Sequence, residues 1–323
     1  MRKERWAPYQ CKTNTEASHP HCAQAGDPQQ LSGFQEILDH GHFPRRKYVP
    51  RAKDCVLSVQ HLGQRKLLMS EIGALLRLDA KTEYMAVYAG AAPGVHTPLL
   101  SDLFPNVTFH LYDPAPFMIR ASERIKLFNV CFTDEIAQTY TRDKYERLVF
   151  ICDIRRSTDE SMVWEDMLAQ RRWHEIMCPA LTSLKFRLPW PGNGVASDSN
   201  QAEYLDGDIH LPIWGPTSTT ESRLVIEDGS HTRNSTRIYD CLAYEEEMCY
   251  FNRVMRPSIH RCQRMLSDGL DGCYDCTAEA RLVDRYNKIW THTKITTERI
   301  SRELNRGIPR GRRNNVECSG PSP

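Results

Sequence analysis

The sequence predicts an α/β protein in which a mostly parallel central sheet is flanked by helices. Three observations support this fold class. Short apolar runs typical of buried strands end at glycine or aspartate, an amphipathic helical pattern precedes the first run, and a glycine-containing turn follows it. Because open parallel sheets bind ligands at the carboxyl ends of their strands, the residues that follow these runs are the candidate site residues.

Composition bounds the domain organisation. The chain has 323 residues, of which 40% are hydrophobic, enough to bury one large core. We expect one α/β domain over residues 46–270, a partly irregular extension over residues 1–45 and a second extension over residues 271–323. The second extension carries a basic tail at residues 310–313, which is either a solubilising end or a patch for nuclear import or RNA contact.

Charge and hydropathy exclude two broad classes of protein. The net charge of +1 excludes a globally basic nucleic-acid binder, so any polyanion must meet a local basic patch. No stretch approaches about 18 consecutive apolar residues, the length typical of a membrane span. The N-terminus also lacks the apolar core of a signal peptide. We therefore expect a soluble, intracellular protein without membrane contact.

The 12 cysteines are dispersed, and a chain of this length needs no disulfides, so we expect reduced thiols. His260, Cys262, Cys273 and Cys276 include one Cys-x-x-Cys pair and are the best candidate zinc ligands. The second pair is incomplete, because only one residue separates His260 from Cys262. The prediction is therefore no metal, with zinc at this cluster as the alternative.

Apolar residues at helical spacing predict an amphipathic helix over residues 64–78, just before the first strand. Lys66 falls in its first turn, where a cation opposes the helix dipole. An ordinary surface position is the alternative for this lysine.

The glycine turn follows a strand that ends at Tyr88. Gly90 and Gly94 frame it, and a side chain at either position would block a ligand lying across the strand ends. Ala92 and Val95 occupy the second and third glycine positions of a dinucleotide fingerprint, which disfavours a phosphate ligand. The turn suits an adenosine ligand without phosphates, such as S-adenosylmethionine, and a purely structural turn is the alternative.

Two acids end the next long strands. Residues 107–112 close on Asp113, about 20 residues after the glycine turn, where an acid can bind both ribose hydroxyls of an adenosine. A turn cap is the alternative, since Asp113 precedes a proline. Residues 148–152 close on Asp153, which should point into the same crevice. Residues 132–134 follow a short strand and are placed to close over an adenine ring.

Basic and aromatic residues follow the later strands. Arg155 and Arg156 come directly after Asp153, where two guanidinium groups could hold phosphates. A further strand runs up to Lys185, and Trp190 lies in a proline-rich turn that can present a flat ring. Residues 192–208 are polar and predict a mobile loop, and Glu221 begins another strand.

Lys66, Asp153, Lys185 and Glu221 should surround one crevice, since each ends or begins a predicted element. Lys185, withdrawn from water beside a second lysine, would lose its proton more readily and could deprotonate a hydroxyl, while the acids hold its orientation. The natural electrophile is the sulfonium methyl of S-adenosylmethionine. Alignment of the two reactants can supply up to ~7 to 11 kcal/mol in favourable cases.

Several short blocks together resemble the poxvirus mRNA cap-specific 2'-O-methyltransferase family. They are Gly63–Glu71, Tyr88–His96, Cys152–Arg155, Ser183–Arg187, Glu221–Leu224 and Tyr244–Met248 with Asn252 nearby, and they follow one another in order from about residue 60 to residue 256. The trypanosome cap-4 ribose methyltransferases are similar, more distant relatives.

This resemblance implies a Rossmann-like, S-adenosylmethionine-dependent methyltransferase that modifies a ribose 2'-hydroxyl near an N7-methylguanosine cap. It implies a catalytic tetrad of Lys66, Asp153, Lys185 and Glu221, with Lys185 as general base. The implied methyl-donor residues are Gln64, Tyr88, Gly90, Gly94, His96, Asp113, Phe132, Thr133 and Asp153. The implied cap and RNA residues are Trp190, Glu245, Arg155, Arg156 and Arg187, with Trp190 stacking on the methylated guanine.

Two departures weaken the cap site: Gly192 replaces the family's second acid, and Ala115 replaces an arginine. The expected partners are capped mRNA and other capping or polyadenylation proteins, for a monomer that is nuclear if cellular and cytoplasmic if viral. Two alternatives remain open: an RNA-binding or polymerase-accessory subunit that retains the fold, and methylation of an internal ribose.

Overall fold

The structure is a computed structural model that describes residues 30–31, 33–48, 60–195, 199–216, 219–228, 234–260 and 272–307. The predicted basic tail and Cys262 therefore lie outside the described residues.

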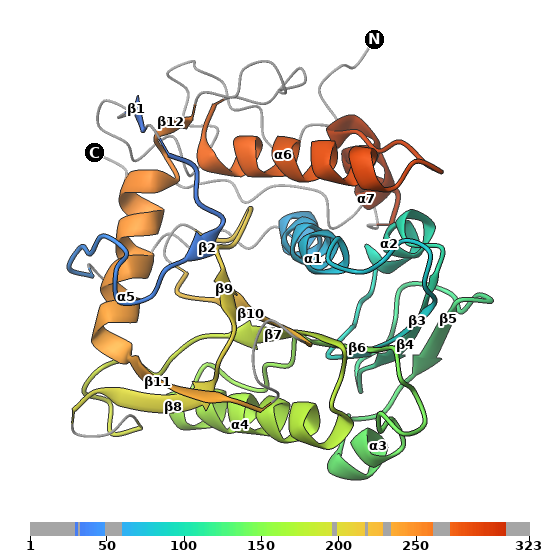
Figure 1. The fold of residues 1–323 in the computed structure, drawn as a ribbon, viewed down its shortest axis with the longest axis horizontal. Helices are drawn as coiled ribbons and strands as arrows, with labels where there is room; N and C mark the ends of the chain where they lie inside the picture. Colours follow the sequence, from blue (N-terminus) through green and yellow to red (C-terminus); the bar gives the residue numbers. More distant parts are fainter. Residues whose placement is uncertain are drawn as a thin grey trace, which may run out of the picture.

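One mixed sheet organises the molecule (Figure 1). Its eight strands lie in the order β2-β9-β10-β7-β6-β3-β4-β5. Their bounds are β2 Ile37–Leu38, β3 Tyr84–Ala89, β4 Val107–Tyr112, β5 Ile125–Phe128, β6 Leu148–Cys152, β7 Leu181–Phe186, β9 Asp208–His210 and β10 Ser222–Glu227. The neighbouring strands β7, β6, β3, β4 and β5 are parallel to one another. Each of β10, β9 and β2 is antiparallel to the strand before it in the sheet, starting from β7. The predicted fold class, a mostly parallel α/β sheet flanked by helices, is confirmed.

Helices cover both faces of the sheet. Their bounds are α1 Gln60–Leu75, α2 Thr97–Leu103, α3 Asp134–Gln138, α4 Glu160–Met177, α5 Cys241–Tyr250, α6 Tyr274–Ile289 and α7 Thr297–Gly307, with a π-helical continuation of α5 over Phe251–Met255. Helices α1, α2, α6 and α7 lie on one face, and α3 and α4 lie on the other (Figure 1). Because α1 begins at Gln60, Lys66 lies in its second turn, not its first, and the dipole argument no longer applies to it.

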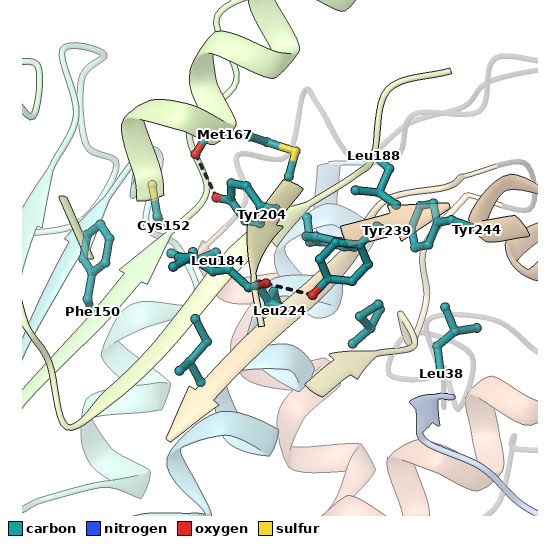
Figure 2. Packing of buried hydrophobic residues seen from close by; sticks show 14 of the residues in the cluster. Leu38, Phe150, Cys152, Met167, Leu184, Leu188, Tyr204, Leu224, Tyr239 and Tyr244 are labelled. Atoms are coloured by element: carbon teal, nitrogen blue, oxygen red, sulfur yellow. Dashed lines mark hydrogen bonds between the residues drawn. The ribbon is translucent and has the colours of Figure 1, made fainter. Parts of the chain in front are cut away.

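The core follows the two-residue period of the strands. In β3, Val87 and Ala89 join the apolar cluster under α4, whereas Ala86 and Tyr88 join the cluster under α1. Figure 2 shows the first cluster, in which Tyr204 donates a hydrogen bond to a main-chain carbonyl of α4. Both faces of the central strands are therefore buried, as their near-continuous apolar runs predicted.

The predicted mobile loop over residues 192–208 is wrong from residue 201 onward. Residues Gln201–Leu205 form β8, which pairs with β11, Thr236–Asp240, as a two-stranded antiparallel ribbon. The Tyr239 hydroxyl donates to the Leu205 carbonyl at 2.7 Å within this ribbon (Figure 2). The alternation of exposed and buried residues in β8 is that of a strand with one covered face.

Residues assigned by sequence to the two extensions take part in the same body. Strand β2 pairs with β9 at the edge of the sheet. Helices α6 and α7 pack against α1, and β1, Gln30–Leu31, pairs with β12, Ile259–His260.

Gly90 is required by the backbone around it. It has φ +79°, and a Cβ there would lie 2.7 Å from the Ile154 nitrogen and 2.8 Å from the Asp153 carbonyl carbon. We expected a clash with a ligand; the structure places the clash with the residues that follow β6. This close approach brings the glycine turn and Asp153 to the same point on the sheet edge.

Candidate active site

A cavity of about 950 Å³ opens at the carboxyl ends of the parallel strands, within the size range of small-molecule sites. Its lining includes eight of the residues predicted to bind donor or RNA or to catalyse: Gly90, Asp113, Phe132, Thr133, Asp153, Arg155, Arg156 and Lys185.

Asp113, after β4, is held by two backbone donors. Its Oδ2 accepts the Ala92 N–H at 3.0 Å, and its Oδ1 accepts the Ala115 N–H at 2.8 Å. The turn-cap role that the sequence left open is therefore present. Each carboxylate oxygen keeps a further lone pair, so the same carboxylate can also accept from ribose hydroxyls.

The wall of the cavity beyond β5 is rigid. Thr133 caps α3 by accepting the Ile136 N–H at 3.3 Å, and the Phe132 ring packs against Trp173 with centroids 4.9 Å apart. The Trp173 indole N–H donates to Asp134 at 2.8 Å. These contacts fix an apolar surface beside Asp113, as a flat ring in this cavity would require.

Other predicted donor residues form a buried cluster against α1. His96 contacts Gln64 through Nδ1 at 2.8 Å and Glu71 through Nε2 at 3.0 Å. Tyr88 is fully buried, and burial raises the pKa of its hydroxyl well above the usual value. These side chains and Gly94 are not part of the cavity lining that the described residues form. Their role in donor binding stays a prediction.

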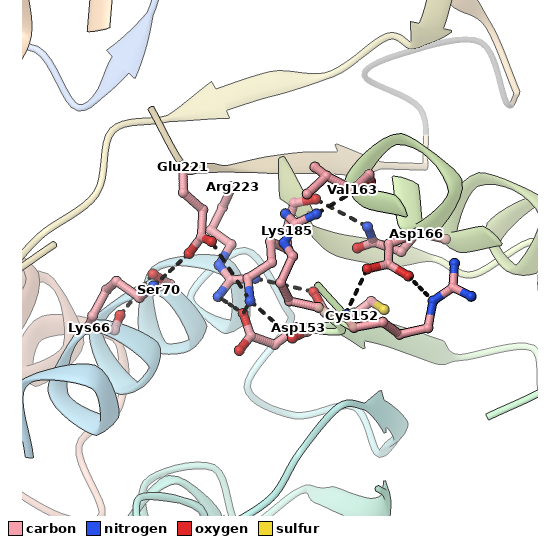
Figure 3. A network of polar contacts seen from close by, with 12 residues as sticks. Lys66, Ser70, Cys152, Asp153, Val163, Asp166, Lys185, Glu221 and Arg223 are labelled. Carbon is pink, nitrogen blue, oxygen red and sulfur yellow. Dashed lines mark hydrogen bonds and ion pairs between the residues drawn. The ribbon is translucent and has the colours of Figure 1, made fainter. Parts of the chain in front are cut away.

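The four residues of the predicted tetrad lie together, although they come from α1 and from the ends of three strands (Figure 3). The Lys185 amine donates to the Asp153 carbonyl at 3.1 Å. It also lies 3.2 Å from Asp153 Oδ1 and 3.7 Å from Glu221 Oε2. Lys66 donates to Glu221 Oε1 at 2.6 Å. The arrangement places Lys185, whose side chain is 9% exposed, between two carboxylates.

Arg223 is a fifth member that the sequence analysis did not assign. Its guanidinium donates to Asp153 Oδ1 and, at 3.2 Å, to the Cys152 carbonyl. The signal was present in the strand period: Arg223 is two residues after Glu221, and β10 places it directly opposite Lys185. The antiparallel pairing of β10 with β7 was not predictable from that spacing.

The charges of this cluster stabilise one another. Burial alone would raise the pKa of the Asp153 carboxyl, but Arg223, Lys185 and Lys66 hold it below the usual value. Burial would likewise raise the pKa of Glu221, and Lys185, Lys66 and Arg223 lower it well below the usual value. Both acids are therefore carboxylates at neutral pH, facing Arg223, Lys66 and the amine of Lys185.

The two arginines that follow β6 already bind groups of α4. Arg156 pairs with Asp166 at 2.5 Å and with Glu165 at 3.2 Å. Arg155 donates to the Val163 carbonyl at 3.3 Å, and burial lowers the pKa of its guanidinium. Both line the cavity, but these contacts compete with the predicted phosphate binding.

Trp190 sits in a turn that Glu160 holds. Glu160 accepts the Trp190 main-chain N–H at 3.2 Å and a hydrogen bond from Arg187, whose guanidinium lies 5.7 Å from the centre of the Trp190 ring. The Tyr48 ring faces Trp190, with centroids 4.8 Å apart and planes tilted by 54°. Sequence reasoning missed Tyr48, which lies in a segment without periodic pattern.

Glu245 lies on α5, and burial together with the charge of Glu246 raises the pKa of its carboxyl. The cap roles of Glu245, Trp190 and Arg187 stay predictions.

In the part of the chain that the structure describes, no group of three or more metal-ligating side chains occurs. Cys273 and Cys276 are buried at the start of α6. Across the same ranges, every helix is too short or too polar to cross a bilayer.

Comparison with protein families gives a match over residues 34–276 to the model described as poly A polymerase regulatory subunit. The chain belongs to this family. It is the family of the poxvirus-type cap 2'-O-methyltransferases that the sequence motifs resemble, so the predicted membership in a methyltransferase family is confirmed.

Two solved structures illustrate the wider similarity. The bluetongue virus protein VP4, described as a multifunctional RNA-capping production line, aligns over 76% of this chain with 11% identity and a TM-score of 0.47. The chain covers 38% of that viral protein. Human methyltransferase-like protein 13 in complex with S-adenosylhomocysteine aligns over 61% of this chain and 93% of its own, with 12% identity and a TM-score of 0.31.

Proposed function

We propose that the protein transfers a methyl group from S-adenosylmethionine to the ribose 2'-hydroxyl of a 5'-proximal nucleotide in capped RNA. The observation that carries the proposal is the position of Lys185: the residue lines the cavity, and its amine lies between the carboxylates of Asp153 and Glu221. Family membership supports the same reaction class.

The residues of the cavity fit the methyl donor. Asp113 offers free carboxylate lone pairs, and Phe132 and Thr133 provide a rigid wall beside it. Gly90 and Lys185 line the same cavity, so the reacting end of a donor would lie near the amine. S-adenosylmethionine supplies an electrophilic methyl on a sulfonium centre.

Lys185 acts in this proposal as the general base for the 2'-hydroxyl. The uncharged amine would take the proton at Nζ as the 2'-oxygen bonds to the methyl carbon. The bond from that carbon to the sulfonium sulfur would break in the same step, and S-adenosylhomocysteine would leave. Asp153 and Glu221 hold the amine in place and stabilise the ammonium that results. Lys66 and Arg223 hold the two carboxylates. No metal is needed in this step, because alignment and proton removal activate the oxygen.

Trp190 and Tyr48 are the proposed faces of the cap site. Their centroids are 4.8 Å apart. A base stacked between the two rings would contact both at van der Waals distance, which requires the rings to be roughly 7 Å apart. The two rings must therefore separate when a guanine enters between them. Ring faces attract the positive charge of N7-methylguanine more than the neutral base.

The test offers labelled donor with RNAs that differ only in the 5' end: N7-methylated cap, unmethylated cap and triphosphate. Label should enter the first RNA, at a ribose 2'-oxygen that nuclease mapping identifies. Equal labelling of all three would contradict cap dependence and favour an internal ribose. Labelling of a base would contradict the reaction itself.

Substitution of Trp190 tests the cap site separately. Trp190→Ala should raise KM for capped RNA by roughly tenfold or more, the range expected for loss of a stacking ring, while Trp190→Phe retains most of the affinity. Steady-state kinetics with donor in excess measures the change. An unchanged KM in Trp190→Ala would place the cap elsewhere.

The family description favours a second role, as a regulatory subunit of a poly(A) polymerase. This role predicts that the chain increases polyadenylation by a partner polymerase and that Lys185→Ala retains this effect while methyl transfer is lost. A polymerase whose rate and product length do not respond to the chain would contradict the second role alone.

A further inference from the structure

Two acidic residues of α6 lie buried where it packs on α1. Asp275 and Glu279, one helical turn apart, are both 0% exposed. Buried charges require partners, and each has an arginine: Asp275 pairs with Arg256 at 3.0 Å, and Glu279 pairs with Arg65. Both residues lie in a helix that the sequence assigned to an extension, and Glu279 lies beyond the matched family region.

Both carboxylates also hold Trp214. Asp275 accepts its main-chain N–H at 2.7 Å, and Glu279 accepts its indole N–H at 2.6 Å. Trp214 has φ +62°, a left-handed conformation that residues with a Cβ rarely adopt, and its side chain is buried. The two hydrogen bonds therefore fix the chain in a conformation it would not otherwise favour, seven residues before Glu221.

The same network continues toward Glu221. Arg256, held by Asp275, donates to the carbonyls of Gly215 at 2.7 Å and Pro216 at 3.1 Å. Asn252 then donates to the Thr219 carbonyl at 2.8 Å. Residues 214–216 are thus fixed by α6 and Arg256, and Thr219, two residues before Glu221, is fixed by the π-helical segment.

The other side of the network fixes Lys66. Its neighbour Arg65 donates to both carboxylate oxygens of Glu279 and, at 2.8 Å, to Ser301 of α7. Because Arg65 and Lys66 are consecutive in α1, an anchored Arg65 sets the rotation of the helix and hence the direction of Lys66. Both α6 and α7 pack against α1, and Figure 1 shows α6 running over it.

We infer that Glu279, supported by Asp275, is a positioning residue of the active site: it sets both halves of the Lys66–Glu221 ion pair, although it lies on a different helix and touches neither. Glu279 acts on Lys66 through Arg65 and on Glu221 through Trp214. The geometric inference stands on its own, and only its consequence for turnover rests on the proposed function.

The test compares three variants of the full chain. Glu279→Gln removes the charge that holds Arg65, and Trp214→Phe removes the indole hydrogen bond together with part of the buried ring. Tyr286→Phe is the matched control, because it deletes another buried hydrogen bond of α6, from the Tyr286 hydroxyl to the Leu103 carbonyl at 2.6 Å. The first readout is the acetylation rate of Lys66 by acetic anhydride, followed by mass spectrometry with exposed Lys81 as internal standard.

Lys66 should be labelled several-fold faster in Glu279→Gln, less so in Trp214→Phe, and at the wild-type rate in Tyr286→Phe. Turnover on capped RNA should fall about tenfold or more in Glu279→Gln, with donor affinity nearly unchanged, since small misplacements cost rate rather than binding. Wild-type labelling of Lys66 in both test variants would overturn the inference, whatever their melting temperatures. A wild-type protein without activity on capped RNA, combined with the expected labelling, would refute the proposed function and leave the positioning role standing.

Discussion

The charged residues around Lys185 determine the surroundings of its amine. Its amine lies 3.2 Å from one carboxylate and 3.7 Å from another, and both stay ionised because the cations around them lower their pKa. The sequence could predict that the four residues lie close together, because three of them end or begin a strand and the fourth lies on the helix before the first long strand. Their catalytic roles stay predictions. The sequence could not predict Arg223 or Tyr48, since their roles depend on the pairing of β10 with β7 and on the return of residues 33–48 to the site.

Arg223→Gln should shift the acidic limb of the pH–rate profile upward. Without this cation, burial raises the pKa of Asp153 with less opposition, so the carboxylate that orients Lys185 is lost at a higher pH. The variant should therefore lose more activity at pH 5.5 than at pH 8. The matched control is Arg77→Gln, since Arg77 pairs with Asp208 at 2.8 Å and with Glu227 at the other end of β10. Parallel profiles for wild type and Arg223→Gln would contradict the assigned electrostatics.

At the scale of the elements, the hydrophobic pattern predicted the helices and strands whose own residues carry the apolar spacing of that element. These are helix α1 and strands β3, β4, β6, β7 and β10. Strand β8 was missed because Gln201 and Glu203 are exposed, and only the distant partner β11 makes the segment a ribbon. Helix α5 changes to π-helical geometry at Phe251 and continues in that form to Met255.

The turn after β3 gives a test at this scale. Gly90→Ala combines a left-handed φ with contacts under 3 Å to the backbone after β6, whereas Gly192→Ala has φ +72° and open space. The control should cost roughly 1–2 kcal/mol of unfolding free energy for backbone strain alone. Gly90→Ala should cost about 1–3 kcal/mol more, because the overlap forces the backbone to shift. Denaturant unfolding measures both, and equal losses would show that the close approach is unimportant.

At the scale of the whole molecule, α6 and α7 join residues that are distant in the sequence. We assigned residues 271–323 to an extension, and within it Asp275 and Glu279 are buried because arginines from distant segments pair with them. No local pattern reveals such long-range pairing. Apolar residues of this extension, Leu282, Tyr286 and Trp290, also belong to the apolar cluster under α1.

Acid should destabilise the whole fold through buried histidine. His174 is 4% exposed, its Nδ1 lies 2.9 Å from Thr182 Oγ1, and burial lowers its pKa from 6.5 to about 4. Below pH 6.5 the unfolded chain takes up a proton that the folded chain refuses, so stability falls as pH drops toward 4.

Between pH 7.5 and pH 5 this group should contribute a loss of about 2 kcal/mol. His174→Gln should flatten the dependence, whereas His42→Gln, at a histidine that is 81% exposed, should leave it unchanged. Denaturant unfolding at the two pH values gives the slopes, and a His174→Gln slope equal to that of wild type would contradict this origin.

The central claim is that the Lys185 amine removes the proton from a ribose 2'-hydroxyl. The most direct measurement is single-turnover methyl transfer to capped RNA by Lys185→Ala, with donor affinity determined by calorimetry on the same sample. We predict a rate lower by about 10²- to 10⁴-fold, the range for loss of a general base, with donor affinity nearly unchanged. A variant that transfers methyl at the wild-type rate would contradict the account.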